Sequence, residues 1–185
     1  MKKIDFAKLS ELGLLDLSGE RGVRIAVFLM NGEYVREEAV SIAMAQFREN
    51  GSNCSFVFVE WYRVCELHRS GDDGTAEPAE ATIMLRLETG QEDHVAGRGD
   101  GPINALDNAM NKVAEVKALG LELGDYHVFK VGSGGSAARV KVVVDWTFHG
   151  WDFRTVATAR SVTEASWLAM VDAYEFAHLA GERIE

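Results

Sequence analysis

Hydrophobic and polar positions divide the chain into a short N-terminal segment and two longer stretches. In residues 1–52, an apolar run at 23–30 ends at an Asn-Gly pair and predicts a strand followed by a turn. Residues 36–48 carry apolar side chains at helical spacing and predict an amphipathic helix. The expected apolar face consists of Val40, Ala43, Met44 and Phe47. The segment therefore predicts a small, linker-like βα unit.

The stretch 55–117 predicts three strands and one helix. Residues 55–66 are rich in Phe, Val, Trp and Tyr, and residues 81–88 alternate apolar side chains with others, so both runs predict strands. A Thr-Gly turn leads to a third strand over 93–98. Pro102 then begins a helix, because its missing N–H group would have no partner at the first helical position anyway. The expected apolar face of this helix is Ile103, Leu106, Met110 and Val113.

The stretch 123–180 repeats this order of elements. Its predicted strands are 125–131, 138–148 and 151–157. His149-Gly150 is expected to form the turn between the last two strands. Ser161 and Glu164 predict a capping box at the start of the final helix. One face of that helix is expected to carry Trp167, Val171, Tyr174 and His178.

The two stretches indicate an internal duplication. At an offset of 60 residues, small residues fall on small residues at the strand-to-helix turn and along the helix. The pairs are Gly97 with Ala157, Gly99 with Ala159, Ala105 with Ala165 and Ala109 with Ala169. One helix on a three-stranded sheet encloses little core, so the halves are expected to pack together. We therefore expect an α+β fold, in which two βββα repeats form a pseudo-twofold domain over 53–185.

Charge and composition narrow the classes of function. The formal net charge is −10 and the pI is near 5.0, so phosphate backbones are repelled and nucleic acid is not an expected partner. The N-terminus lacks the apolar core of a signal peptide, and no run reaches the roughly 20 apolar residues of a membrane span. A cytoplasmic protein with no membrane partner is expected. Cys54 and Cys65 lie on one predicted strand, which cannot fold back to bridge them, and are expected to be reduced core thiols.

Residues that could carry catalysis or bind a metal are scattered. Glu60 lies on an aromatic-rich strand, where an inward carboxylate could act as a base and an outward one would be a solvated position. The His residues lie on different elements without metal-ligand spacing. Gly132–Ser136 is expected to be a hairpin loop. Four aromatic residues around the last hairpin are core or dimer-interface positions or, alternatively, a ligand box: Trp146, Phe148, Trp151 and Phe153. We assign no catalytic residue, metal ligand or cofactor.

Three short motifs carry a resemblance to a known family. Gly97, Gly99, Gly101, Pro102, Ile103 and Ala105 match the pattern Gly-x-Gly-x-Gly-Pro-(Val/Ile)-x-Ala. Glu164-Ala165-Ser166 and the run Leu123–Val128 provide two further matches. With the βββα duplication, these motifs resemble the C-terminal regulatory domain of α-isopropylmalate synthases and citramalate synthases.

This resemblance implies a homodimer that binds a small branched amino-acid or keto-acid effector, leucine or isoleucine, and regulates an acetyl-CoA-dependent acyltransferase. An effector carboxylate can bind free N–H groups at a helix N-terminus, and glycines allow the backbone to approach it. The implied effector-binding residues are Gly97, Gly99, Asp100, Gly101, Pro102, Ile103 and Ala105 at the first turn, and Ala157, Ala159, Arg160, Ser161 and Thr163 at the second.

The second turn departs from the family pattern, which usually has an aspartate and more glycine there. Arg160 either favours a more acidic ligand or is a surface charge. The chain is also too short for the catalytic barrel of about 250 residues. No acyltransferase activity is therefore expected from it alone. Its catalytic partner would be a separate chain or a barrel outside this sequence. The alternatives are a free-standing domain recruited as a small-molecule-binding protein or enzyme in a specialised pathway, and a purely structural subunit.

Overall fold

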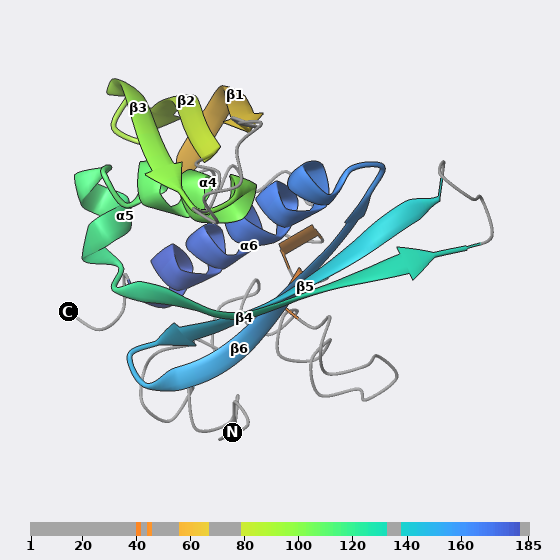
Figure 1. Ribbon diagram of the computed structural model, residues 1–185. Helices are drawn as coiled ribbons and strands as arrows, with labels where there is room; N and C mark the ends of the chain where they lie inside the picture. The colour runs from red at the N-terminus through yellow and green to blue at the C-terminus, as the bar shows by residue number, and fades with distance from the viewer. Residues whose placement is uncertain (1–39, 42–43, 46–55, 67–78, 133–137, 182–185) are drawn as a thin grey trace. The chain divides into compact units, whose positions relative to one another are not determined.

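The computed structural model describes residues 40–41, 44–45, 56–66, 79–132 and 138–181. These residues form an α+β fold with two βββα repeats, which confirms the expected fold class (Figure 1). The repeats fall into two compact units, one within 55–118 and one that joins 119–185 to the N-terminal segment. Val40, Ser41, Met44 and Ala45 are helical, and both Val40 and Met44 are buried as expected. The predicted strand at 23–30, Cys54 and the loop at 133–136 lie outside the described residues.

The first unit contains one antiparallel sheet of three strands. Its order is β1 (Val57–Glu66), β2 (Ala79–Leu87) and β3 (Glu92–Gly99). The central strand alternates as predicted, because one of its faces lies under helix α4 (Pro102–Met110) (Figure 1). The buried side chains on that face are Ala79, Ala81, Ile83, Leu85 and Leu87.

Helix α4 lies directly on strand β3. A Cβ atom added at Gly97 would come within 2.6 Å of the carbonyl oxygen of Ala105, and it would also clash with the backbone of Ala109. Because real Cβ atoms do not approach backbone so closely, glycine at this position sets the distance between helix and sheet. Ala105 and Ala109 are fully buried at the same contact. The small residues that the sequence places along this helix face therefore serve close helix–sheet packing.

The predicted first helix is shorter than expected. Helix α4 ends at Met110, and the N–H group of Val113 then donates to the carbonyl oxygen of Met110 at 3.0 Å. This tight turn leads into a second short helix, α5 (Ala114–Ala118). Val113 is buried, so it fills the core as predicted although it lies in the turn.

The second unit repeats the plan with a longer helix. Its strands are β4 (Leu121–Val131), β5 (Arg139–Phe148) and β6 (Trp151–Ala159), and helix α6 (Val162–Gly181) covers one face of the sheet (Figure 1). His149 and Gly150 both have positive φ angles, 46° and 79°, as the predicted two-residue turn requires.

Aromatic side chains form the core of this unit. The Trp146 ring meets Tyr174 edge-on at 6.0 Å, and Phe153 meets Phe176 at 4.8 Å. The Trp146 Nε1–H group donates to the buried Thr155 hydroxyl at 2.8 Å, which satisfies its only donor. Trp146, Phe148 and Phe153 are therefore core residues, as the first of the alternatives expected.

Both edge strands β1 and β4 contain a bulge at the same level of their sheets. The β1–β2 register shifts between Val59 and Trp61, and the β4–β5 register shifts between Leu123 and Tyr126. The second bulge explains why β4 was predicted to begin only at Asp125: its extra residue breaks the alternation in the middle of a longer strand. The extra residue in β1 is Glu60, which is exposed, so the outward alternative is correct.

The position of Cys65 differs from the one expected from the sequence. It lies at the end of β1 on the face away from α4, is exposed, and is a free thiol. The expectation of a core thiol is therefore wrong for Cys65, because α4 covers only the other face of this sheet.

The packing of α4 on β3 predicts the effect of an added methyl group at Gly97. We expect Gly97→Ala to lower the free energy of unfolding by about 1–3 kcal/mol, because the new Cβ forces the helix off the strand. Gly101→Ala is the control, since a Cβ there meets nothing within 4 Å. Urea unfolding followed by circular dichroism measures both, and equal losses in the two variants would contradict the account.

Candidate functional site

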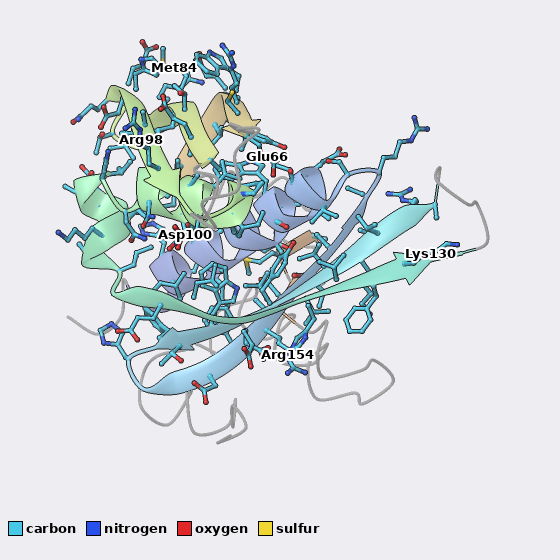
Figure 2. The ribbon with its side chains drawn as sticks, in the orientation of Figure 1. Glu66, Met84, Arg98, Asp100, Lys130 and Arg154 are labelled. Atoms are coloured by element: carbon cyan, nitrogen blue, oxygen red, sulfur yellow. The ribbon has the colours of Figure 1, made fainter. Side chains whose placement is uncertain are left out.

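The first strand-to-helix turn is built from consecutive residues of β3 and α4. A Cβ atom at Gly99 would lie 2.5 Å from the backbone nitrogen of Ala105, so this glycine also permits a close backbone approach. Gly101 is different: its φ of −165° is ordinary extended backbone, and it precedes Pro102 as the capping residue. Figure 2 shows Asp100 at this turn. The structure thus brings the whole first set of predicted residues, 97–105, together.

The hydrogen bonds of this turn leave the start of α4 without a side-chain cap. The N–H group of Asp100 donates to Asn104 Oδ1 at 3.2 Å, and that of Ala105 donates to the carbonyl oxygen of Gly101 at 2.9 Å. Gly101 has no side chain that could accept from the next N–H groups of the helix, those of Ile103 and Asn104. The helix dipole and these donors together favour an anion at this end.

The second turn has a different chemistry. The Ser161 hydroxyl accepts a hydrogen bond from the N–H group of Glu164 at 3.0 Å, which confirms the predicted serine cap. Ala159 is buried, whereas Arg160 projects into solvent. Ala157 and Thr163 are half-buried. The N-terminus of α6 is therefore capped by its own side chain.

The two predicted halves of the site lie in different units. The first turn belongs to the unit of β1–β3, and the second turn belongs to the unit of β4–β6. Each half is locally ordered as a strand–turn–helix connection. An effector site shared between them remains a prediction.

Comparison with known proteins identifies the family. Residues 43–178 match the model of a family described as the LeuA allosteric (dimerisation) domain. The chain belongs to this family. The match covers both βββα repeats and both turns.

This LeuA domain is similar to part of the length of several larger proteins. The (R)-citramalate synthase of Aquifex aeolicus is 38% identical over 115 residues, which is 60% of this chain and 21% of that protein. The (R)-citramalate synthase of Geobacter sulfurreducens is 31% identical over 149 residues, 78% of this chain and 28% of that protein. The 2-isopropylmalate synthase of Psychromonas ingrahamii is 30% identical over 108 residues, which is 58% of this chain and 20% of that protein. The chain spans less than a third of the length of each of these three relatives.

Two family motifs meet in this LeuA domain. Tyr126 belongs to the run at 123–128, and Ser166 belongs to the Glu-Ala-Ser run. The Tyr126 hydroxyl and Ser166 Oγ are 3.1 Å apart. Ser166 is fully buried and donates its single hydroxyl hydrogen to the carbonyl oxygen of Val162 at 2.7 Å. Tyr126 must therefore be the donor to Ser166. Their role is to fasten strand β4 to the first turn of α6.

A charged cluster on the β4–β6 sheet was missed by the sequence reasoning. Donor atoms of Asp125, His127 and Asp145 lie within 4.8 Å of one another. Arg154 binds both carboxylate oxygens of Asp145, through Nε and through Nη2 at 2.9 Å. Figure 2 shows Arg154 on the face of the sheet away from α6. These donor types suit a divalent cation, but the carboxylate of Asp145 is already paired with a guanidinium group, and we assign no metal ion to the cluster.

The sequence signal for this cluster was the spacing of Asp125 and His127 two residues apart on one strand. Side chains two residues apart share a face of a strand, but Asp145 joins them only through the register of β4 with β5 at the bulge.

Among the described residues, no helix is long and apolar enough to cross a membrane.

The fastening of β4 by Tyr126 predicts energetic coupling with Ser166. We expect Tyr126→Phe and Ser166→Ala each to lower the free energy of unfolding by about 0.5–1.5 kcal/mol, and the double variant to lose less than the sum of the two. Chemical denaturation of the three variants gives the coupling. Tyr126→Phe combined with Thr147→Val is the control, because Thr147 bonds Asp152 instead and the two losses should add. Strict additivity of Tyr126 and Ser166 would refute the fastening.

Proposed function

We propose that this chain is the regulatory and dimerisation domain of an acetyl-CoA-dependent acyltransferase of the 2-isopropylmalate or citramalate synthase type. The support is the family match over both repeats and relatives whose names are (R)-citramalate synthase and 2-isopropylmalate synthase. In this proposal the chain itself carries out no acyl transfer. It forms a homodimer in the cytoplasm and acts on a catalytic domain by binding an effector.

The proposed effector is a small branched amino acid or its keto acid. The observation that carries this choice is the N-terminus of α4, where Gly101 provides no capping side chain. A carboxylate bound there would accept hydrogen bonds from the N–H groups of Ile103 and Asn104 and would balance the positive end of the helix dipole. Leucine, isoleucine, valine and their keto acids all carry that carboxylate.

The space next to the turn at Gly101 is open, as such a ligand requires. A Cβ at Gly101 would meet nothing within 4 Å, so the backbone can be approached from outside. The half-buried Ile103 side chain is an apolar group beside the same donors. An apolar wall next to a carboxylate site is what a branched aliphatic ligand requires.

The second turn is proposed to contribute charge. Arg160 is exposed and stands immediately before the Ser161 cap. The N–H group of Glu164 is already bonded to Ser161, so this turn offers a side-chain cation in place of a free helix N-terminus. A guanidinium group favours an anionic or carbonyl group, so this turn by itself suits a keto acid as well as an amino acid.

The proposed carboxylate site predicts that Gly101→Ser weakens effector binding. Serine is a preferred capping residue, and the extended backbone at position 101 suits it. Its hydroxyl would accept from the α4 N–H groups in place of the ligand. We expect calorimetric titration to give a dissociation constant at least tenfold weaker for this variant, while the chain itself gains a few tenths of a kcal/mol of stability.

The matched control is Ala96→Ser, which adds the same hydroxyl to an exposed position of β3 on the face away from α4. Its affinity should equal that of the unaltered chain. Equal affinity of Gly101→Ser and the unaltered chain would contradict the carboxylate site. No binding of any branched amino acid or keto acid at millimolar concentration would contradict the effector proposal as a whole.

A further inference from the structure

Each three-stranded sheet of this chain has two edge strands, whose outward N–H and C=O groups can pair with another strand. Proteins protect such edges with bulges, charges or covering side chains, because an unprotected edge associates. The edges of β1, β3, β4 and β6 can therefore be compared for the protection that each one has.

The edge of β3 is closed by side chains that follow it in the sequence. Asn108 Nδ2 donates to the carbonyl oxygen of Arg98 at 2.8 Å, and Lys112 Nζ donates to the carbonyl oxygen of Ala96. Both carbonyl groups belong to alternate residues of one strand and thus point to the same edge. A pairing strand would have to displace both side chains.

The edge of β6 is closed in a similar way. The N–H group of Val156 donates to the Ser41 hydroxyl at 2.8 Å, and Arg139 Nη2 donates to the carbonyl oxygen of Thr158 at 2.9 Å. Strand β1 is protected differently. Its bulge at Glu60 interrupts the strand, and the exposed charges of Arg63 and Glu66 follow.

Strand β4 lacks this protection in its second half. Beyond the bulge, Tyr126–Val131 runs as a regular strand, and β5 is its one pairing partner among the described strands. Three large apolar side chains are exposed here: Val128 (43%), Phe129 (52%) and Val131 (41%). Lys130 is the one residue of this segment that carries a formal charge, with histidine counted as neutral. Figure 2 shows it near the far end of the strand. Strand β1 also exposes Phe58 and Trp61, each at 46%, but its segment after the bulge carries the charges of Arg63 and Glu66. Among the described strands, β4 is therefore the edge that combines exposed apolar residues with a single charge.

We propose that Tyr126–Val131 of β4 pairs antiparallel with the same segment of a second copy of this chain, so that the two β4–β6 sheets become one continuous sheet. This proposal rests on the dimerisation role proposed above and assigns a surface to it. A two-fold axis through the segment makes the contact self-complementary, so it closes at two chains. Exposed apolar side chains on both faces of the strand would meet their counterparts.

Charge along the strand supports a second copy as the occupant. Strand β4 begins with the acidic residues Glu122 and Asp125 and ends near Lys130. Antiparallel pairing of two identical strands brings the acidic half of one copy towards the lysine end of the other. A strand from an unrelated protein would have no such built-in match.

The test is the dissociation constant of the dimer, measured by sedimentation equilibrium. The variant Phe129→Lys/Val131→Lys places two charges on the proposed interface, as proteins do to block an edge. We expect its dimer to dissociate at least a hundredfold more readily than that of the unaltered chain. The control is Leu168→Lys, which adds one lysine on α6 at a side chain with comparable exposure, 42%. That variant should dimerise like the unaltered chain.

The outcomes separate this proposal from the proposed function. If the unaltered chain is a dimer and the double lysine variant dimerises equally well, the β4 interface is wrong and dimerisation stands. If the unaltered chain is monomeric at every concentration tested, both are wrong. Hydrogen exchange of the unaltered chain covers the case in which the variant does not fold. The amides of 126–131 that point to the open edge should lose protection on dilution below the dissociation constant, whereas those bonded to β5 should not. Exchange of this segment that does not change with dimer population would overturn the β4 interface.

Discussion

The direct contact between the backbone of α4 and that of β3 at Gly97 is the constraint on which the first turn depends. No side chain fits between helix and strand at this point, so the helix axis is fixed at backbone distance from the sheet. The chain must then turn from β3 into α4 within a few residues, which glycine at 99 permits. One consequence is chemical: the residue at the cap position before the helix is Gly101, which has no side chain that could cap it.

The second repeat shows what the same fold does with different residues. Alanine stands at 157 and 159, where the first repeat has glycine, and Ser161 caps the helix that follows. Tyr126 and Ser166 then fasten β4 to that helix. Within the described residues, duplication has therefore produced one turn whose helix has no side-chain cap and one turn that is closed by its own serine. In our account this difference assigns carboxylate binding to the first turn.

Local patterns were sufficient to predict the features that depend on neighbouring residues. The alternation of Ile83, Leu85 and Leu87, the His149-Gly150 turn and the Ser161 cap each follow from spacing within a few residues, and the structure confirms them. The interior bulge of β4 and the ion pair of Asp145 with Arg154 depend on which strands pair and in which register. Cys65 was misjudged for a related reason, since burial on β1 depends on which face α4 covers. A site shared by both turns depends on two units, and no local pattern carries that information.

The central claim is that the uncapped start of α4 receives the carboxylate of a branched effector. Nuclear magnetic resonance of the amide N–H groups during titration with leucine or isoleucine tests it most directly. Our account predicts that the signals of Ile103 and Asn104 shift downfield and saturate with the dissociation constant found by calorimetry, because each donor gains a charge-assisted hydrogen bond. The amide of Glu164, already bonded to Ser161, serves as the internal reference and should shift less. Saturable binding that leaves the Ile103 and Asn104 amides unchanged would contradict the claim.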